Sequence, residues 1–311
     1  MYLVCGEALF DVFVAPAGSR SNRLNLEAVA GGSPFNVAVG LARLGTPSAL
    51  FTGISSDHLG QQLRQVLDEE GVDTRYLVPF DAPTTLAMVA LGTDGAPIYS
   101  FRGEGCADRL PCDEHLAALG EEIRGIQVGS YSLVTAPIAD TLLSLVRRES
   151  GRRLISLDPN IRLNVEPDLL RWRERVEAFA ELAHLIKVSD EDLALLYPGE
   201  APEAIAHRWL QGPCELVLLT RGGEGAQLFS RRHGELYCAA QAVAVRDTVG
   251  AGDTFQAATL SYLHTHGLDS ANALASIEHG QLESLLGFAV QAAAITCSRR
   301  GPDLPYRYEI D

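Results

Sequence analysis

The chain has 311 residues, of which 47% are apolar and 21% are charged, a composition typical of folded globular proteins and not of disordered ones. Its 40 acidic and 25 basic residues give a formal net charge of −15. That charge argues against a broad surface for nucleic acid or for anionic membranes, because both require faces rich in lysine and arginine. The length suits one large α/β domain, and we expect a single domain over residues 1–311.

The sequence predicts a cytoplasmic protein. Residues 1–7 lack the basic region of a signal peptide, and the apolar stretch 285–297 is too short to cross a bilayer. The six cysteines form no Cys-x-x-Cys motif, and five of them lie in or beside apolar runs. We therefore expect reduced, structural thiols, with Cys106 in a polar loop as the one candidate for reactivity.

Short apolar strands alternate with amphipathic helices along most of the chain, which is typical of βαβ units around a mainly parallel sheet. The predicted strands of this alternation are 3–5, 49–53, 126–128, 154–157, 185–188 and 216–219. The predicted helices run from Ser33 to a stop at Gly45, through 63–67 to a stop at Gly71, and then over 140–149, 169–183, 190–196, 203–210, 251–266, 270–279 and 282–298. A hairpin turn is expected at 231–234 and an extended run at 243–245.

Four extended runs lie outside this alternation, at 11–15, 22–29, 85–91 and 97–101. The last two flank Thr93-Asp94-Gly95, a strong hairpin signal. We predict that the four runs form a small separate sheet, a β lid made from about residues 11–29 and 84–101.

The strongest chemical signal is the string RDTVGAGDTF, which begins at Arg246. Gly250, Ala251 and Gly252 are small enough for the backbone to approach an anion, and their amides would be the unpaired donors of a helix N-terminus. Such donors suit the charge of a transferring phosphoryl group. Asp253 then stands where it can accept the proton of an attacking hydroxyl. The alternative is an aspartate that only caps a helix, which we would favour for an isolated G-x-G-D but not for the whole string.

Five motifs in the same order resemble those of the pfkB, or ribokinase-like, carbohydrate kinases. They are GGSPFNVA from Gly31, DPNIR from Asp158, KVSDED from Lys187, TRGGEGA from Thr220 and the string from Arg246. The resemblance covers nearly the whole chain. It implies an α/β fold, a ribokinase-like three-layer sandwich with a mainly parallel central sheet and a small β-sheet lid.

The resemblance also implies a role for individual residues. Asp253 would be the general base, with Arg162 near the sugar or the moving phosphoryl group and an anion hole formed by the amides of Gly250, Ala251 and Gly252. The sugar would contact Asp11, Gly31, Gly32, Asn36, Phe101, Arg102 and Asn160. The nucleotide would contact Lys187, Ser189, Thr220, Gly222, Gly225 and Val249. ATP would bring Mg²⁺ near Asp192, and a monovalent cation such as K⁺ would lie beside Asp247 and carbonyls near Arg300 and Gly301.

Several positions depart from the family pattern. Ser189 and Asp192 replace the common Asn and Glu of the motif linked to magnesium, while Val290 and Pro302 stand where Asn and Ala are usual. These changes affect the expected contacts of the nucleotide base and the cation loop, and they leave the base and the anion hole intact.

The loop FRGEGCADR from Phe101 resembles that of bacterial fructokinases, which implies conversion of fructose to fructose 6-phosphate. Arg102 stands where an aromatic residue is usual, and its guanidinium would suit a carboxylate, as in 2-keto-3-deoxygluconate kinases. Kinases of ribose or of a nucleoside stay open, as does a sugar- or nucleotide-binding regulator without activity. A dinucleotide oxidoreductase is disfavoured because no G-x-G-x-x-G follows the first strand. The only expected partners are the small-molecule sugar and a second copy of the chain, joined through the lid.

Overall fold

The computed structural model describes residues 1–14, 25–91, 97–116 and 118–310. A nine-stranded sheet runs through this part of the chain in the order β13-β12-β11-β10-β9-β8-β1-β4-β5. All neighbours from β11 to β5 are parallel, and β12 and β13 extend the sheet as an antiparallel hairpin. The strands are β1 Tyr2–Cys5, β4 Ser48–Ser55, β5 Leu77–Phe80, β8 Gly125–Gly129, β9 Leu154–Asp158, β10 Leu185–Ser189, β11 Leu216–Thr220, β12 Gly225–Ser230 and β13 Gly234–Ala239.

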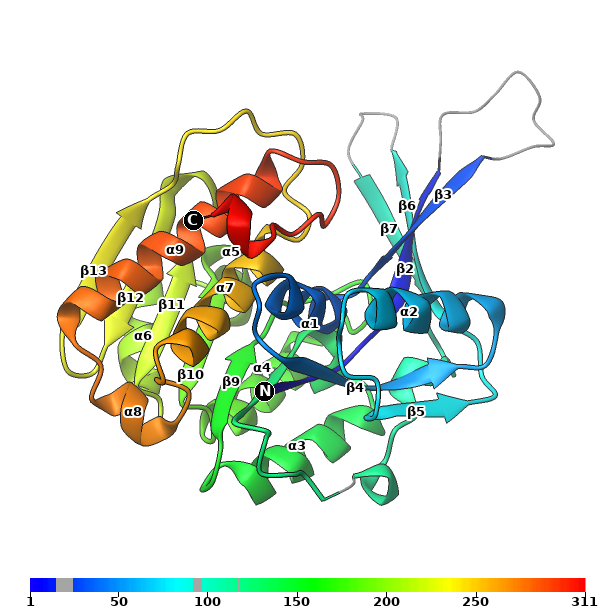
Figure 1. The fold of residues 1–311 in the computed structure, drawn as a ribbon, viewed down its shortest axis with the longest axis horizontal. Helices are drawn as coiled ribbons and strands as arrows, with labels where there is room; N and C mark the ends of the chain where they lie inside the picture. The colour runs from blue at the N-terminus through cyan, green and yellow to red at the C-terminus, as the bar shows by residue number, and fades with distance from the viewer. Residues whose placement is uncertain (15–24, 92–96, 117, 311) are drawn as a thin grey trace.

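Helices cover both faces of this sheet (Figure 1). On one face lie α1 Ser33–Arg43, α2 His58–Glu69, α7 Ala251–Thr265 and α9 His279–Cys297, with the short α8 Ala271–Ala275 beside them. On the other lie α3 Ile138–Glu149, α4 Leu169–Ala180, α5 Asp190–Leu196 and α6 Pro202–Trp209. Side chains of β1 alternate between the two hydrophobic cores, Tyr2 and Val4 in one, Leu3 and Cys5 in the other. The predicted three-layer α/β sandwich is confirmed.

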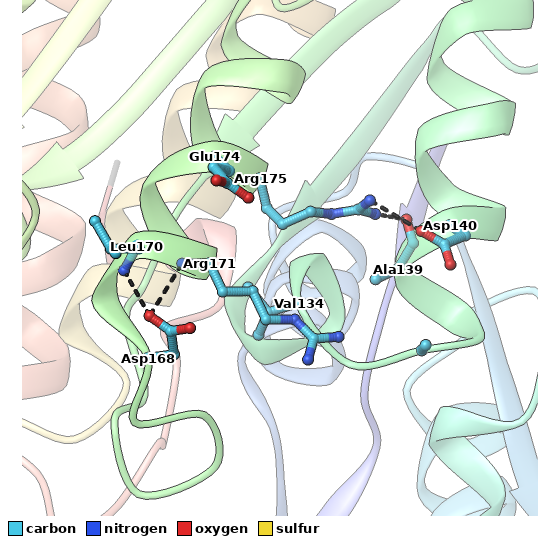
Figure 2. Close-up of a pocket in the computed structure, with 9 residues that line it drawn as sticks. Val134, Ala139, Asp140, Asp168, Leu170, Arg171, Glu174 and Arg175 are labelled. Carbon is cyan, nitrogen blue, oxygen red and sulfur yellow. Dashed lines mark hydrogen bonds and ion pairs between the residues drawn. The ribbon is translucent and has the colours of Figure 1, made fainter.

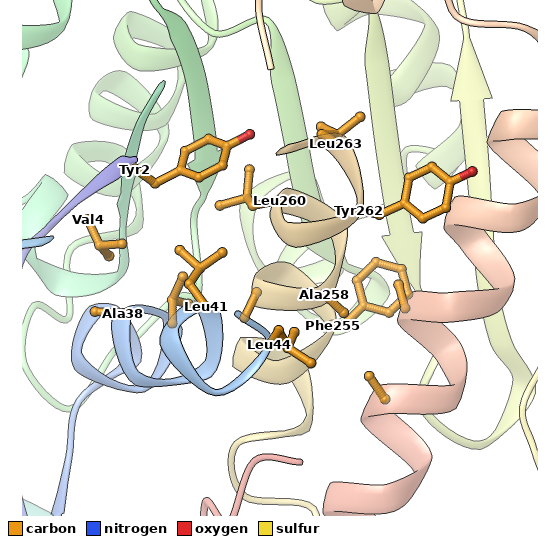
Figure 3. Close-up of a cluster of buried hydrophobic side chains, with 14 of the residues drawn as sticks. Tyr2, Val4, Ala38, Leu41, Leu44, Phe255, Ala258, Leu260, Tyr262 and Leu263 are labelled. Atoms are coloured by element: carbon orange, nitrogen blue, oxygen red, sulfur yellow. The ribbon is translucent and has the colours of Figure 1, made fainter. Parts of the chain in front are cut away.

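The pair α1 and α7 forms the centre of one core (Figure 3). Leu41 from α1 and Leu260 and Leu263 from α7 are fully buried against the strands. A Cβ added at Gly40 of α1 would collide with the Leu304 side chain and lie 2.8 Å from Cβ of Ala257 in α7. This glycine therefore permits the close approach of the two helices whose first turns carry the candidate site.

We expect Gly40→Ala to lower the free energy of unfolding by about 1–3 kcal/mol, because the added methyl group overpacks this contact. Gly287→Ala in α9 is the matched control, since nothing lies within 4 Å of the Cβ position there. The control should gain about 0.5–1 kcal/mol from helix propensity. Urea denaturation of both variants measures the difference, and equal stabilities would show that the approach of α1 to α7 is not tight.

The four runs predicted to pair do form a separate sheet, in the order β3-β2-β6-β7. Its strands are β2 Leu9–Val14, β3 Leu26–Gly31, β6 Thr85–Leu91 and β7 Pro97–Arg102. Strands β2 and β6 are parallel, and the two outer pairs are antiparallel. The sheet projects from the central sandwich beside α1 (Figure 1). The predicted turn at 93–95 and most of the segment between β2 and β3 lie outside the described residues.

The extended run expected at 243–245 belongs to neither sheet, and among the described residues no further strand pairs with the outer edge of β13. Two other local predictions were wrong. The helix expected over 270–279 ends at Ala275, and α9 begins at His279, where Glu278 and Gln281 form a capping box. Strand β5 was missed, a short edge strand that contains Pro79.

Cys106 also differs from its prediction, since it is only 4% exposed and burial raises the pKa of its thiol. A buried thiol with a raised pKa is a poor nucleophile. Among the described residues, no helix combines the length and apolarity needed to span a membrane.

Candidate active site

Asp253 lies in the first turn of α7 and is 8% exposed. Its Oδ1 accepts a hydrogen bond from Oγ of Ser33 (2.6 Å), and its Oδ2 accepts one from Nδ2 of Asn36 (2.8 Å). Both donors belong to the first turn of α1, so two helix N-termini meet at this carboxylate. Each carboxylate oxygen accepts more than one hydrogen bond, so lone pairs stay available for a substrate hydroxyl.

The turn before Asp253 is the N-terminus of α7, where we predict the anion hole. Gly250 caps α7 with φ 81°, a conformation that favours glycine. The amides of Gly250 and Gly252 have no acceptor among the described residues, as expected for a helix N-terminus that receives an anion. The amide of Ala251, however, donates to the carbonyl of Thr248 at 3.2 Å. Two of the three amides predicted to form the anion hole are thus without a protein acceptor among the described residues, and the third is bonded within the turn.

Asp11 reaches the same place from the small sheet. A Cβ at Gly31 would lie 2.8 Å from Oδ2 of Asp11 and 4.0 Å from Oδ1 of Asn36. Burial raises the pKa of Asp11 to about 6, with Arg162 acting against this rise and Asp253 adding to it. The fold thus brings together four residues predicted from separate stretches of sequence, Asp11, Asn36, Arg162 and Asp253.

A buried ion pair lies below the turn of α7. Nζ of Lys187 donates to Oδ2 of Asp158 at 2.9 Å, and the two side chains are 5% and 2% exposed. Burial raises the pKa of Asp158 to about 6, against the attraction of Lys187. For Lys187, burial opposes the charge, but the attraction of Asp158, Asp192 and Asp253 outweighs it and raises the pKa. A Cβ at Gly252 would be only 3.1 Å from Nζ of Lys187, so this ammonium lies against the anion turn.

Asp192 holds the loop that follows β9. Its Oδ1 accepts from the amide of Ile161 (2.9 Å) and its Oδ2 from Oγ of Ser189 (2.7 Å). Nearby, Oδ1 of buried Asp158 has no hydrogen-bond partner. Hard cations such as Mg²⁺ prefer carboxylate oxygens and water, so this free oxygen fits a hydrated divalent cation.

A family model described as pfkB family carbohydrate kinase matches residues 1–307. The chain belongs to the PfkB family of carbohydrate kinases.

Individual relatives agree. A fructokinase of Rhizobium leguminosarum bv. trifolii is 36% identical over 284 residues, which are 91% of this chain and 86% of that protein. Fructokinase-2 of Solanum lycopersicum is 30% identical over 96% of this chain and 92% of its own. The crystal structure of a Xylella fastidiosa fructokinase with bound ATP superposes with a TM-score of 0.90 at 29% identity, covering 99% of this chain and 96% of that one. The predictions of PfkB membership and of an ATP-dependent carbohydrate kinase are confirmed.

The predicted nucleotide residues of this PfkB kinase follow the carboxyl ends of neighbouring strands. Ser189 ends β10 and pairs with Thr220, which ends β11. Gly222 and Gly225 follow with φ 48° and 110°. Ser189 and Thr220 therefore lie side by side at the carboxyl edge of the sheet, where open α/β sheets bind their ligands.

Asp247 fastens the start of this turn to the C-terminal loop. Its Oδ1 accepts from the amide of Val249 (3.1 Å) and its Oδ2 from that of Gly301 (2.9 Å). A Cβ at Gly250 would lie 2.8 Å from Cα of Pro302, so this loop packs against the anion turn. The structure thus joins the two segments expected to form the monovalent-cation site.

The remaining predicted sugar residues lie around the base of the small sheet and in the loop after β9. The ring of Phe101 contacts that of Tyr131 edge to face, with centroids 6.0 Å apart, while Arg102 is exposed at the end of β7. Gly32 and Asn160 both have positive φ, 103° and 42°.

A pocket of about 470 Å³ lies away from these residues, between α3 and α4 (Figure 2). Asp168 caps the N-terminus of α4 by accepting from the amides of Leu170 and Arg171, and Arg175 pairs with Asp140 across the opening. No predicted site residue lines this pocket.

Sequence reasoning missed two members of the site. Ser33 was read only as a helix start, although Gly32 is the cap and the Ser33 hydroxyl binds Asp253 instead. Asp158 was seen only as part of a motif. The sequence offered one signal for both residues. Each is a short polar residue within a motif, close to a position that was assigned a role.

We expect kcat/KM for the sugar to rise with pH around a midpoint near 6 and to level off above about 7, because the ionised carboxylate of Asp11 accepts hydrogen bonds at both oxygens and the neutral carboxyl accepts fewer. Arg162→Gln should move this rise to higher pH, because the charge of Arg162 holds the pKa of Asp11 down. Initial rates at subsaturating sugar between pH 5 and 8 measure both. If the midpoint of this pH dependence is the same in the variant, the charge of Arg162 does not act on Asp11.

Proposed function

We propose that this kinase transfers the γ-phosphoryl group of ATP to the primary hydroxyl at C6 of fructose and produces fructose 6-phosphate. The observation that carries the proposal is the carboxylate of Asp253, fixed by Ser33 and Asn36 at the N-terminus of α7 and facing the group that contains Asp11. Relatives named fructokinase at 36% and 30% identity support fructose as the acceptor.

Asp253 is the general base of the proposed reaction. It takes the proton of the attacking hydroxyl as the oxygen approaches phosphorus, so no free alkoxide has to form. Its bonds to Ser33 and Asn36 hold the carboxylate in place before the sugar arrives, which removes the need to orient it during the reaction.

The sugar lies between the two sheets in this proposal. Asp11 and Asn36 bind its hydroxyls, and Gly31 and Gly32 leave room for it, because a side chain at Gly31 would meet Asp11. The remaining predicted contacts are Phe101, Arg102, Asn160 and Arg162. The small sheet acts as a lid that excludes water and so limits hydrolysis of ATP.

Charge on the phosphoryl group is stabilised by the free amides of Gly250 and Gly252 and by the ammonium of Lys187. The bound ATP of the Xylella relative supports nucleotide binding along Ser189, Thr220, Gly222, Gly225 and Val249. Asp158 and Asp192 would hold Mg²⁺, largely through water, and the ion would supply further positive charge to the phosphates. The carboxylate of Asp247 and the nearby carbonyls of the C-terminal loop suit K⁺.

Two further predictions belong to this proposal. A homodimer joined through the lid is one of them, and the exposed Leu26 on β3 would lie in that interface. The free cysteines, three of them buried, support the cytoplasm, where thiols stay reduced.

A panel of sugars tests the proposal. Release of ADP is followed with fructose, ribose and 2-keto-3-deoxygluconate, the last because exposed Arg102 at the base of the lid offers a partner for its carboxylate. We expect the highest kcat/KM with fructose. A higher value with either other sugar would replace fructose as the substrate, and no turnover with any sugar would favour a regulator without activity.

A further inference from the structure

Glu7 is a buried carboxylate at the junction of the two sheets, and the proposed reaction does not use it. It lies in the three-residue link between β1 of the central sheet and β2 of the small sheet. Glu7 is only 2% exposed. A carboxyl group is unfavourable in such a place unless specific bonds compensate for the lost water.

The compensating bonds come from one short segment. Oε2 of Glu7 accepts from Oγ of Ser132 at 2.6 Å, and the nearby hydroxyl of Ser130 also favours the ionised carboxylate. Ser130 has φ 57°, a left-handed conformation that a non-glycine residue adopts only when its surroundings hold it there. Burial raises the pKa of Glu7 to about 7 in spite of these bonds, and Asp108 adds to the rise. In the described part of the chain, no cationic side chain forms an ion pair with Glu7.

The other side of Glu7 supports the turn that starts α1. A Cβ at Gly32 would lie 3.0 Å from the carbonyl oxygen of Glu7 and 3.2 Å from its Cγ. Gly32 has φ 103° and its carbonyl accepts the amide of Asn36, the first bond of the helix. A shift of Glu7 would therefore also shift the turn that carries Gly31 and Asn36.

We propose that Glu7 is a positioning residue for the sugar site. Its carboxyl, bonded to Ser132, fixes the link that leads into β2 and the turn at Gly32 that leads into α1. The side chains of Asp11 and Asn36 depend on these two segments for their separation. The inference rests on the proposed role of those two residues in sugar binding, and Glu7 itself touches neither the sugar nor the reacting atoms.

Buried space alone does not explain this carboxyl group. An apolar side chain of similar volume would fill the same place without a desolvation penalty. A carboxylate, by contrast, accepts the Ser132 hydroxyl at 2.6 Å and so sets the distance between the link and the segment after β8.

Glu7→Gln tests the proposal with little change of volume. We expect KM for the sugar to rise about tenfold, which corresponds to about 1.4 kcal/mol, while kcat and KM for ATP change less than about twofold. Ser132→Ala should raise KM for the sugar in the same direction but by less. Glu149→Gln is the matched control, because Glu149 is also a buried carboxylate (4% exposed) but binds Arg153 on the far side of the fold. The control should alter the midpoint of thermal unfolding and leave both KM values unchanged.

The proposal is overturned if Glu7→Gln folds and its KM for the sugar is unchanged. A lower kcat with both KM values unchanged also overturns it, because that pattern indicates a merely structural role. If that variant does not fold, Ser132→Ala decides in the same way. The measurements use the sugar with the highest kcat/KM in the panel, so a failure of fructose as substrate and a failure of Glu7 as a positioning residue give different results.

Discussion

Asp253→Asn is expected to lower kcat by about 10²–10⁴-fold and to leave the affinity for the sugar within about threefold of the unchanged enzyme. The substitution keeps the shape of the side chain but removes its ability to accept a proton. One acceptor oxygen still faces Ser33, and the amide of Asn36 can turn to present its oxygen to the new amide group. The site should therefore stay folded and lose only the base.

Stopped-flow kinetics gives kcat for this variant, and calorimetry gives its affinity for the sugar. Ser33→Ala is the control, because it removes one bond to Asp253 and keeps the base. We expect its kcat to fall only about 3–10-fold, the effect of one hydrogen bond. Near-normal turnover in Asp253→Asn would contradict a general base at this position.

Lys187→Met should reduce both catalysis and stability. The ammonium lies against the anion turn at Gly252, so we expect a loss of about 10²–10³-fold in kcat, comparable to the removal of one preorganised donor. The substitution also leaves Asp158 buried without its cation, which should lower the free energy of unfolding by about 3–5 kcal/mol.

The double variant Lys187→Met/Asp158→Asn separates the two effects. It removes the unpaired charge, so most of the stability should return while kcat stays low. Urea denaturation and steady-state kinetics on the three variants complete the cycle. Asp158 is also a proposed Mg²⁺ ligand, so the double variant is compared with Asp158→Asn alone. If adding Lys187→Met to Asp158→Asn does not lower kcat further, Lys187 serves only the ion pair and does not act on the phosphoryl group.

Much of the fold could be predicted because its signals are local. The strand at 216–219 is a continuous apolar run, and the strand at 185–188 is apolar except for Lys187, as expected where both faces of a parallel sheet are buried. The run at 243–245 has a similar local pattern but lies in no sheet, because strand formation also requires a partner and the free edge of β13 has none there.

The site was predictable as a set of motifs but not as a set of contacts. Ser33 and Asp253 are 220 positions apart, and only the packing of α1 on α7 brings them within hydrogen-bond distance. The orientation of Lys187 toward Gly252 likewise depends on how α7 lies across the edge of the sheet. Glu7 gives no sign of burial in the sequence, because charged residues are almost always exposed unless paired.

The most direct test of the account is a crystal structure with fructose and a non-hydrolysable ATP analogue. We predict that the oxygen at C6 lies within about 3 Å of a carboxylate oxygen of Asp253, with the terminal phosphate of the analogue at the amides of Gly250 and Gly252. A fructose molecule whose C6 hydroxyl points away from Asp253, with that carboxylate still bonded only to Ser33 and Asn36, would contradict it.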